Sequence, residues 1–170
     1  MLAIKGQQRV MGDDDIIVSK TNLKGHLTYT NDVFLDIADF SAGEVFGKPH
    51  SVVRNEAMPR CIFKLLWETI QAGREIFAYV VNKTKSGDHY WVLAHVTPSF
   101  DESGAIAGYH SNRRKPRAEA VAKISELYDV LLAEEQRHAN AKEGLRASYA
   151  LLQSILNDKG VDYDQYVLAL

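Results

Sequence analysis

Only one cysteine, Cys61, occurs among the 170 residues, so the chain cannot form an internal disulfide bond. A single thiol in a chain of this length is typical of a protein from a reducing compartment. The sequence has no run of about 20 apolar residues, which a membrane-spanning helix needs. Residues 1–12, a loose leader, lack the apolar core of a signal peptide. Together these absences predict a cytoplasmic protein without membrane insertion.

An excess of positive charge is also missing. Lys and Arg total 20 and Asp and Glu total 22, which gives a net charge of −2. A general nucleic-acid binder needs a basic surface that neutralises phosphates, so we expect no nucleic-acid partner. One local basic cluster spans residues 113–117. It is interpreted as a solvated hinge, with contact to phosphates as the alternative.

The motifs of common enzyme classes are absent. There is no Gly-rich loop ending in Gly-Lys-Ser/Thr, no His-Glu-x-x-His helix and no Gly-x-Ser-x-Gly turn. Cys61 follows Arg60, a neighbour that favours the thiolate, but its place in an amphipathic helix favours an inert core position. No two histidines stand at metal-ligand spacing. The histidines are His26, His50, His89, His95, His110 and His138. The sequence therefore predicts a protein that is not an enzyme and has no metal site.

The first part of the chain alternates short strand and helix signals. Residues 16–18 and 26–30 are predicted strands of a hairpin, with Gly25 in the turn between them. Asn31 is placed to cap a following helix. Residues 39–58 contain two glycines and a proline, a composition that favours short helical turns.

A clearer helix and three more strands follow. Pro59 opens an amphipathic helix and Gly73 closes it. Residues 75–84, 89–99 and 105–113 are predicted strands separated by tight turns. The order of strand pair, helices and strand meander predicts an α+β fold, a five-stranded antiparallel sheet with helices on one face.

The composition shifts to Ala, Glu, Leu and Lys over residues 117–156. Heptad positions are apolar from Val121 to Leu131 and from Leu145 to Leu156, but polar between. This pattern predicts either one helix of about 60 Å or two helices that meet near residues 140–144. In both cases the apolar stripe needs a partner, and a homodimer formed through the N- and C-terminal helical segments would supply it.

Several segments resemble a PAS domain, which implies the PAS fold over roughly residues 14–114. The central hairpin, Asn82 to Val92 with its Gly87-Asp88-x-Tyr90-Trp91 core, is the most specific of them. The other matching segments are residues 21–34, 43–49 and the Gly108-Tyr109 pair.

A narrower resemblance is to the FAD-binding sensor domain of bacterial aerotaxis receptors. Its carriers include Pro49-His50, Arg54, Met58-Pro59, Trp67 and the hairpin at residues 82–92. The resemblance implies that Arg54 and its neighbours serve flavin binding and that Trp67 and Asn82 line the pocket. The expected cofactor-binding residues are Phe34, His50, Arg54, Asn55, Trp67, Val80, Asn82 and Trp91. The family usually reads Arg-His-Pro-Asp-Met-Pro where this chain has Arg54-Asn55-Glu56-Ala57-Met58-Pro59, so a His and an Asp are replaced.

The resemblance also divides the chain and implies a function. We expect a leader at residues 1–12, a PAS sensor domain at 13–115, a helical segment at 116–157 and a tail at 158–170. The leading hypothesis is an FAD-binding redox or oxygen sensor that signals through its C-terminal helix to a separate chemotaxis or two-component protein. The alternatives are a haem-binding gas sensor, with His50 or another histidine as ligand, and a cofactor-free dimerisation or interaction module. No cysteine stands where the light-sensing branch of the family needs one, so we expect no cysteinyl photoadduct.

Overall fold

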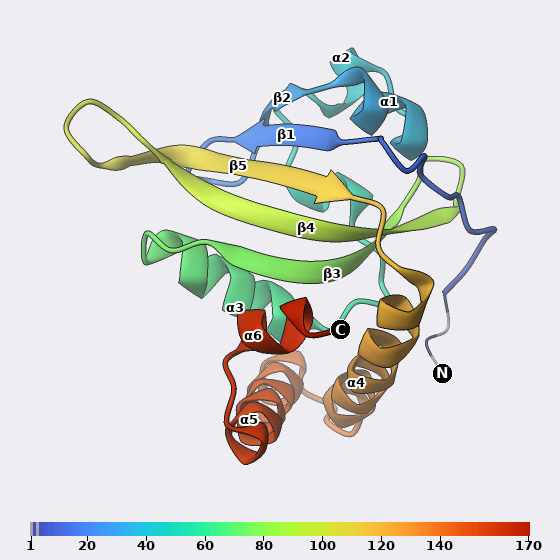
Figure 1. The fold of residues 1–170 in the computed structure, drawn as a ribbon, viewed down its shortest axis with the longest axis vertical. Coiled ribbons are helices and arrows are strands. Elements are labelled where there is room, and N and C mark those ends of the chain that lie inside the picture. Colours follow the sequence, from blue (N-terminus) through green and yellow to red (C-terminus); the bar gives the residue numbers. More distant parts are fainter. Residues whose placement is uncertain (1, 3) are drawn as a thin grey trace.

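Five strands form one antiparallel sheet in the order β2-β1-β5-β4-β3 (Figure 1). The computed structural model of the chain describes residues 2 and 4–170. The strands are β1 (Ile17–Thr21), β2 (Leu27–Thr30), β3 (Ile76–Lys83), β4 (His89–Phe100) and β5 (Ile106–Arg114). The predicted hairpin and the predicted meander are therefore confirmed. They join into one sheet because β1 pairs with β5.

The helical elements between the hairpin and the meander pack over one face of the sheet, called here the inner face. They are α1 (Asp32–Ala38), α2 (Ala42–Val45), the 3-10 helix η1 (His50–Val53) and α3 (Arg60–Gln71). Asn31 caps α1 as expected, because its side-chain oxygen accepts a hydrogen bond from the backbone N–H of Phe34. Pro59 precedes the first residue of α3, and Gly73 follows its end with a φ of 78°.

The C-terminal segment forms a helical hairpin and a short third helix. The elements are α4 (Ala118–Gln136), α5 (Ala141–Lys159) and α6 (Tyr163–Leu168). Of the two predicted alternatives, two helices are correct and a single 60 Å helix is not. The break lies at Asn140, whose side chain accepts a hydrogen bond of 2.8 Å from the Lys142 N–H and so starts α5. The expected tail contributes α6.

The apolar stripe of the C-terminal segment is buried within the same chain. Ile124, Leu131 and Leu152 are each 0% exposed. In Figure 1, α4, α5 and α6 gather at the β3 side of the sheet. There α5 contacts α3, and α6 contacts β3. The partner that the stripe needs therefore lies within the chain, in the packing of α4 against α5 and of the hairpin against α3, and the homodimer stays a prediction.

The leader is docked rather than loose. The Arg9 N–H donates to the carbonyl of His89 over 2.7 Å, and the His89 N–H donates to the carbonyl of Gln7 over 3.0 Å. The Arg9 guanidinium also pairs with Asp39 and Asp88. No helix occurs among the described residues of 1–12, so the predicted N-terminal helical segment is not present there.

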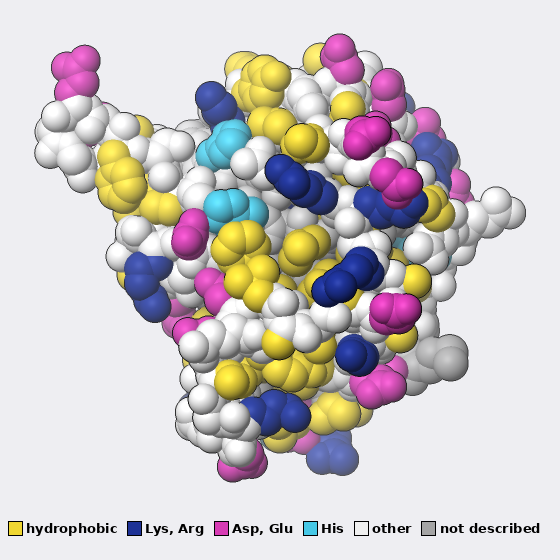
Figure 2. Space-filling view, in the orientation of Figure 1, with side chains coloured by type: hydrophobic (Ala, Val, Ile, Leu, Met, Phe, Trp, Pro, Cys, Tyr) yellow, Lys and Arg dark blue, Asp and Glu magenta, His cyan; other side chains and the backbone are white. Residues whose placement is uncertain are grey.

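The surface charges and the lengths of the helices bear on nucleic-acid binding and on membrane insertion. Figure 2 shows basic side chains interspersed with acidic ones over the face that it draws. Within residues 2 and 4–170, no helix has both the length and the apolar character that crossing a bilayer requires.

Candidate functional site

A cavity of about 380 Å³ lies between the inner face of the sheet, η1 and α3. Its apolar walls come chiefly from α3 and from the middle strands. The lining from helices and loops is Lys24, Gly25, Pro49, His50, Ser51, Val53, Arg54, Phe63, Leu66, Trp67 and Ile70. The lining from strands is Ser19, Thr21, Val80, Asn82, Ala94, Val96, Tyr109, His110, Ser111 and Arg113. The size and the mixture of apolar walls with a few polar groups are typical of a small-molecule site.

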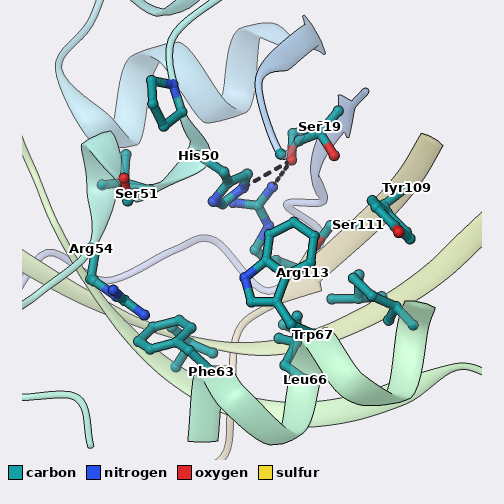
Figure 3. Close-up of a pocket in the computed structure, with 18 of the residues that line it drawn as sticks. Ser19, His50, Ser51, Arg54, Phe63, Leu66, Trp67, Tyr109, Ser111 and Arg113 are labelled. Carbon is teal, nitrogen blue, oxygen red and sulfur yellow. Dashed lines mark hydrogen bonds between the residues drawn. The ribbon is translucent and has the colours of Figure 1, made fainter. Parts of the chain in front are cut away.

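The structure brings five of the expected cofactor-binding residues together around this cavity. These residues are His50, Arg54, Trp67, Val80 and Asn82. They come from three separate segments: η1 with the residue after it, α3, and β3. Figure 3 shows His50, Arg54 and Trp67 arranged around the same space.

Three expected residues lie elsewhere. Phe34 is fully buried behind the lining, edge-on to the ring of His50, with a centroid distance of 6.3 Å. Asn55 closes a turn, because its side-chain oxygen accepts the Ala57 N–H over 2.9 Å. Trp91 points to the opposite face of the sheet, since successive strand residues alternate and its neighbours Tyr90 and Val92 point inward. Its ring stacks on that of Tyr128 in α4, with centroids 6.4 Å apart.

Arg113 is the main feature that the sequence interpretation missed. The basic cluster at 113–117 was expected to be a solvated hinge, but the Arg113 side chain lines the cavity and the residue is 2% exposed. The reason is strand alternation: Tyr109, Ser111 and Arg113 face inward from β5, whereas Arg114 is exposed. Attention to that alternation would have identified it.

The Arg113 guanidinium is buried without a carboxylate beside it. Its Nη2 donates to the Ser19 hydroxyl (Figure 3), while Nε and Nη1 have no hydrogen-bond partner among the described residues. The lining contains no Asp or Glu within residues 2 and 4–170. Burial lowers the Arg113 pKa to about 10, so the group remains charged at neutral pH. A buried charge of this kind is costly unless something pairs with it.

His50 is neutral beside this charge. Burial, together with the positive charge of Arg113, lowers its pKa to about 3. The Nε2 atom of His50 lies 3.2 Å from the Ser19 hydroxyl oxygen. The Ser19 hydroxyl thus lies within hydrogen-bond distance of both Arg113 and His50 and joins the three side chains at the wall of the cavity.

Two more unpartnered donors lie near Arg113. The Asn82 side-chain Nδ2 and the Tyr90 hydroxyl are buried and have no hydrogen-bond partner in the described part of the chain. They face each other on paired strands, close enough for Asn82 to influence the hydroxyl but outside hydrogen-bonding geometry. Burial raises the Tyr90 pKa to about 12, while Arg113 and Asn82 oppose that rise, so the hydroxyl keeps its proton.

Aromatic side chains on α3 form much of the opposite wall. The Trp67 ring meets Tyr109 edge to face at 5.5 Å. Gly25 lets Trp67 approach the β1–β2 turn, because a Cβ there would lie 2.8 Å from the indole. The Arg54 guanidinium lies over the Phe63 ring at 3.8 Å, a cation–π contact. The cavity is thus an apolar slot with aromatic walls and several hydrogen-bond donors in its lining.

Comparison with known proteins gives a consistent set of similarities. The family described as PAS domain matches residues 13–111. The aerotaxis receptor of Escherichia coli (strain K12) is 36% identical over 127 residues, which is 75% of this chain and 25% of the receptor. The nitrogen fixation regulatory protein of Klebsiella pneumoniae is 22% identical over 143 residues, or 84% of this chain and 25% of that protein. This chain therefore spans about a quarter of the length of these relatives.

Solved structures of light-oxygen-voltage proteins share the fold. An RNA-binding light-oxygen-voltage receptor superimposes with a TM-score of 0.58 and 18% identity over 69% of this chain and 34% of that chain. A light-oxygen-voltage domain studied with a flavin analogue has a TM-score of 0.56 and 16% identity, covering 65% of this chain and 83% of that one. At this identity the similarity establishes the fold alone.

Proposed function

The chain belongs to the PAS domain family, and from that membership we propose that its cavity binds FAD and that it serves as a redox or oxygen sensor. A sensor of this kind acts by binding and conformational change rather than by catalysis. The similarity to an aerotaxis receptor supports this proposal, as does the flavin studied in a light-oxygen-voltage domain of the same fold.

The observation that carries the proposal is the set of unpartnered donors in the lining of an apolar slot. Asn82 Nδ2 and Arg113 Nε and Nη1 are buried without acceptors among the described residues. Buried polar groups are rarely left in this state, so their acceptors are expected to come from a ligand. The flavin ring system is flat and apolar on its faces, with carbonyl oxygens and ring nitrogens at its edge. Its chemistry therefore matches the donor set.

Each part of the lining has a distinct role in this proposal. Trp67, Phe63 and Val80 would contact the faces of the ring, and Asn82 and Arg113 would donate to acceptors at its edge. Arg54 lies at a different part of the cavity from Arg113 (Figure 3), where its charge suits the phosphates of FAD. A bound flavin supplies reversible reduction. The protein supplies binding, orientation and a fixed positive charge beside the ring.

Two alternatives are less well supported by the geometry. A haem would need an available histidine nitrogen, but His50 Nε2 lies within hydrogen-bond distance of Ser19. A cofactor-free interaction module would leave the Arg113 charge buried with no carboxylate in the lining and with Nε and Nη1 lacking hydrogen-bond partners among the described residues, a costly arrangement. The proposed output is a conformational change that reaches a separate chemotaxis or two-component protein.

An absorbance spectrum of the purified protein, before and after reconstitution with FAD, tests the proposal. We expect the paired blue and near-ultraviolet bands of a flavin, retained at one FAD per chain after gel filtration. An intense Soret band would favour haem. Protein that stays colourless after reconstitution would contradict flavin binding.

A further inference from the structure

Helix α3 is the wall between the cavity and the C-terminal helices. One side of α3 lines the cavity through Phe63, Leu66, Trp67 and Ile70. The other side contacts α5, where the Tyr149 hydroxyl donates to the Glu68 carboxylate over 2.7 Å. Any ligand that fills the cavity must therefore press on an element that also holds the C-terminal hairpin.

The first turn of α3 receives its cap from a distant part of the chain. Pro59, at the capping position, has no side-chain acceptor, so the first N–H groups of the helix need a partner from elsewhere. The Cys61 N–H donates to Glu135 Oε1 over 3.1 Å, and Arg60 Nε donates to Glu135 Oε2 over 2.9 Å. Glu135 lies in the last turn of α4.

The same carboxylate also holds α5. The hydroxyl of Ser148, which is 0% exposed, donates to Glu135 Oε1 over 2.9 Å. Gly144 makes the approach possible, because a Cβ there would lie 2.5 Å from the Glu135 carbonyl oxygen. Glu135 is itself 6% exposed. One buried carboxylate therefore connects α3, α4 and α5, and each of its contacts is within hydrogen-bond distance.

Arg54 links this carboxylate to the cavity. It lines the cavity and lies a few residues before α3. Burial lowers the pKa of Arg54, and the negative charge of Glu135 opposes that shift, so the two groups are electrostatically coupled. Glu135 is thus joined to the site by its hydrogen bonds to the first turn of α3, and its charge also acts on Arg54.

We propose that Glu135 is a positioning residue that couples occupancy of the cavity to the docking of the α4–α5 hairpin. This inference rests on the proposed function, since it takes the cavity to be a ligand site. When a ligand shifts the first turn of α3, the Glu135 carboxylate must follow α3 or lose the bonds to Cys61 and Arg60. A buried carboxylate tolerates the loss of a partner poorly, so the hairpin has two discrete states, docked and released.

Hydrogen exchange of the full chain with and without FAD tests this coupling. The variant is Glu135→Gln, which keeps the shape but removes the charge. The matched control is Glu134→Gln, because Glu134 pairs only with Arg137 and His138 at the surface among the described residues. For the wild-type protein we expect FAD to change amide exchange in α4–α5 on the order of tenfold. In Glu135→Gln the exchange is already faster without FAD, and FAD changes it little. Glu134→Gln behaves as the wild type does.

The reciprocal measurement and a milder variant keep the test decisive. Coupling is reciprocal, so docking of the hairpin must change FAD affinity by the factor by which FAD changes docking, and Glu135→Gln, which disturbs docking, should change the FAD dissociation constant. If Glu135→Gln does not fold, Ser148→Ala removes one of the three side-chain and backbone donors and should give a smaller change in the same direction.

The outcomes separate this inference from the proposed function. If FAD binds but neither FAD nor Glu135→Gln alters exchange in α4–α5, the coupling is wrong and flavin binding stands. If FAD does not bind to any variant, flavin binding is wrong. The coupling is then decided by Trp67→Phe, which alters the cavity wall of α3 without touching Glu135. Unchanged exchange in α4–α5 of that variant would overturn the coupling.

Discussion

The two faces of the sheet differ in whether their buried polar groups have hydrogen-bond partners. On the inner face, Asn82, Tyr90 and Arg113 each leave at least one buried donor without a partner among the described residues. In the C-terminal layer, the Tyr128 hydroxyl donates to the Tyr79 carbonyl over 2.6 Å and lies 2.9 Å from the Tyr163 hydroxyl. Tyr163 is thus the donor to Tyr128, and this network is complete.

The difference distinguishes a ligand site from structural packing. An unsatisfied buried donor costs about 1–3 kcal/mol, so several together are a substantial penalty. A penalty confined to one face of the sheet, around one cavity, indicates that the missing acceptors belong to a ligand. The satisfied network on the other face is what stable packing requires.

Acid should destabilise the inner face first, through His50. Its pKa is 6.5 in the unfolded chain and about 3 in the fold. Between these values the unfolded state binds more protons, so the free energy of unfolding falls as the pH drops through this window. The full loss is roughly 3–5 kcal/mol. Urea denaturation between pH 7 and pH 4 measures it. His50→Gln should flatten this dependence, and a slope equal to that of the wild type would contradict it.

Replacing Arg113 by an uncharged residue should weaken FAD binding without lowering the stability of the apo protein. In Arg113→Met the apo protein should be as stable as the wild type or more so, because an unpaired buried charge is replaced by an apolar chain. Loss of its hydrogen bonds to the ligand should weaken FAD binding about 100-fold, or about 2.7 kcal/mol.

The matched control for this variant is the adjacent Arg114→Met. Arg114 is exposed at the end of the same strand, so its replacement should leave FAD affinity unchanged. Fluorescence titration gives the affinities and urea denaturation the stabilities. Equal loss of affinity in both variants would show that Arg113 acts only through net charge.

The sequence was sufficient for the elements and for part of the site. Hydrophobic alternation and turn residues identify all five strands, and the capping signal at Asn31 marks a helix start. The resemblance placed Arg54, Trp67 and Asn82 at one cavity. These features are local or family-wide, and each can be recognised within a short stretch of sequence.

The misassigned residues depend on three-dimensional relations. Trp91 and Asn82 belong to the same matching hairpin, but strand alternation sends them to opposite faces. Arg113 stands in a run of basic residues, so the sequence alone predicts the same exposed position for it as for its neighbours. Glu135 occupied a polar gap in a heptad pattern, and its role emerges only when α3 and α5 are brought against it. Pairing across such distances leaves no local signal.

The tyrosine network of the C-terminal layer should respond in the opposite sense to Arg113. Tyr128→Phe leaves the Tyr79 carbonyl and the Tyr163 hydroxyl without Tyr128 as partner, which should cost about 1–2 kcal/mol of stability. FAD affinity should change less than threefold, because Tyr128 lies on the other face of the sheet. Tyr166→Phe is the control, since Tyr166 is only partly buried. A stability gain in Tyr128→Phe would contradict the contrast between the faces.

The smallest effect is expected at Trp91, and it tests the assignment of faces directly. Trp91 and Trp67 are the only tryptophans in the chain, and only Trp67 lines the cavity. Trp91→Phe should therefore leave FAD affinity within about twofold, since its ring packs on Tyr128 rather than on a ligand. Trp67→Phe should weaken it about tenfold through loss of aromatic contact. Fluorescence adds a second readout, because a bound flavin should quench the nearby Trp67 more strongly than Trp91. Equal losses of affinity in the two variants would mean that the ligand reaches both faces, and the division between a ligand face and a structural face would be wrong.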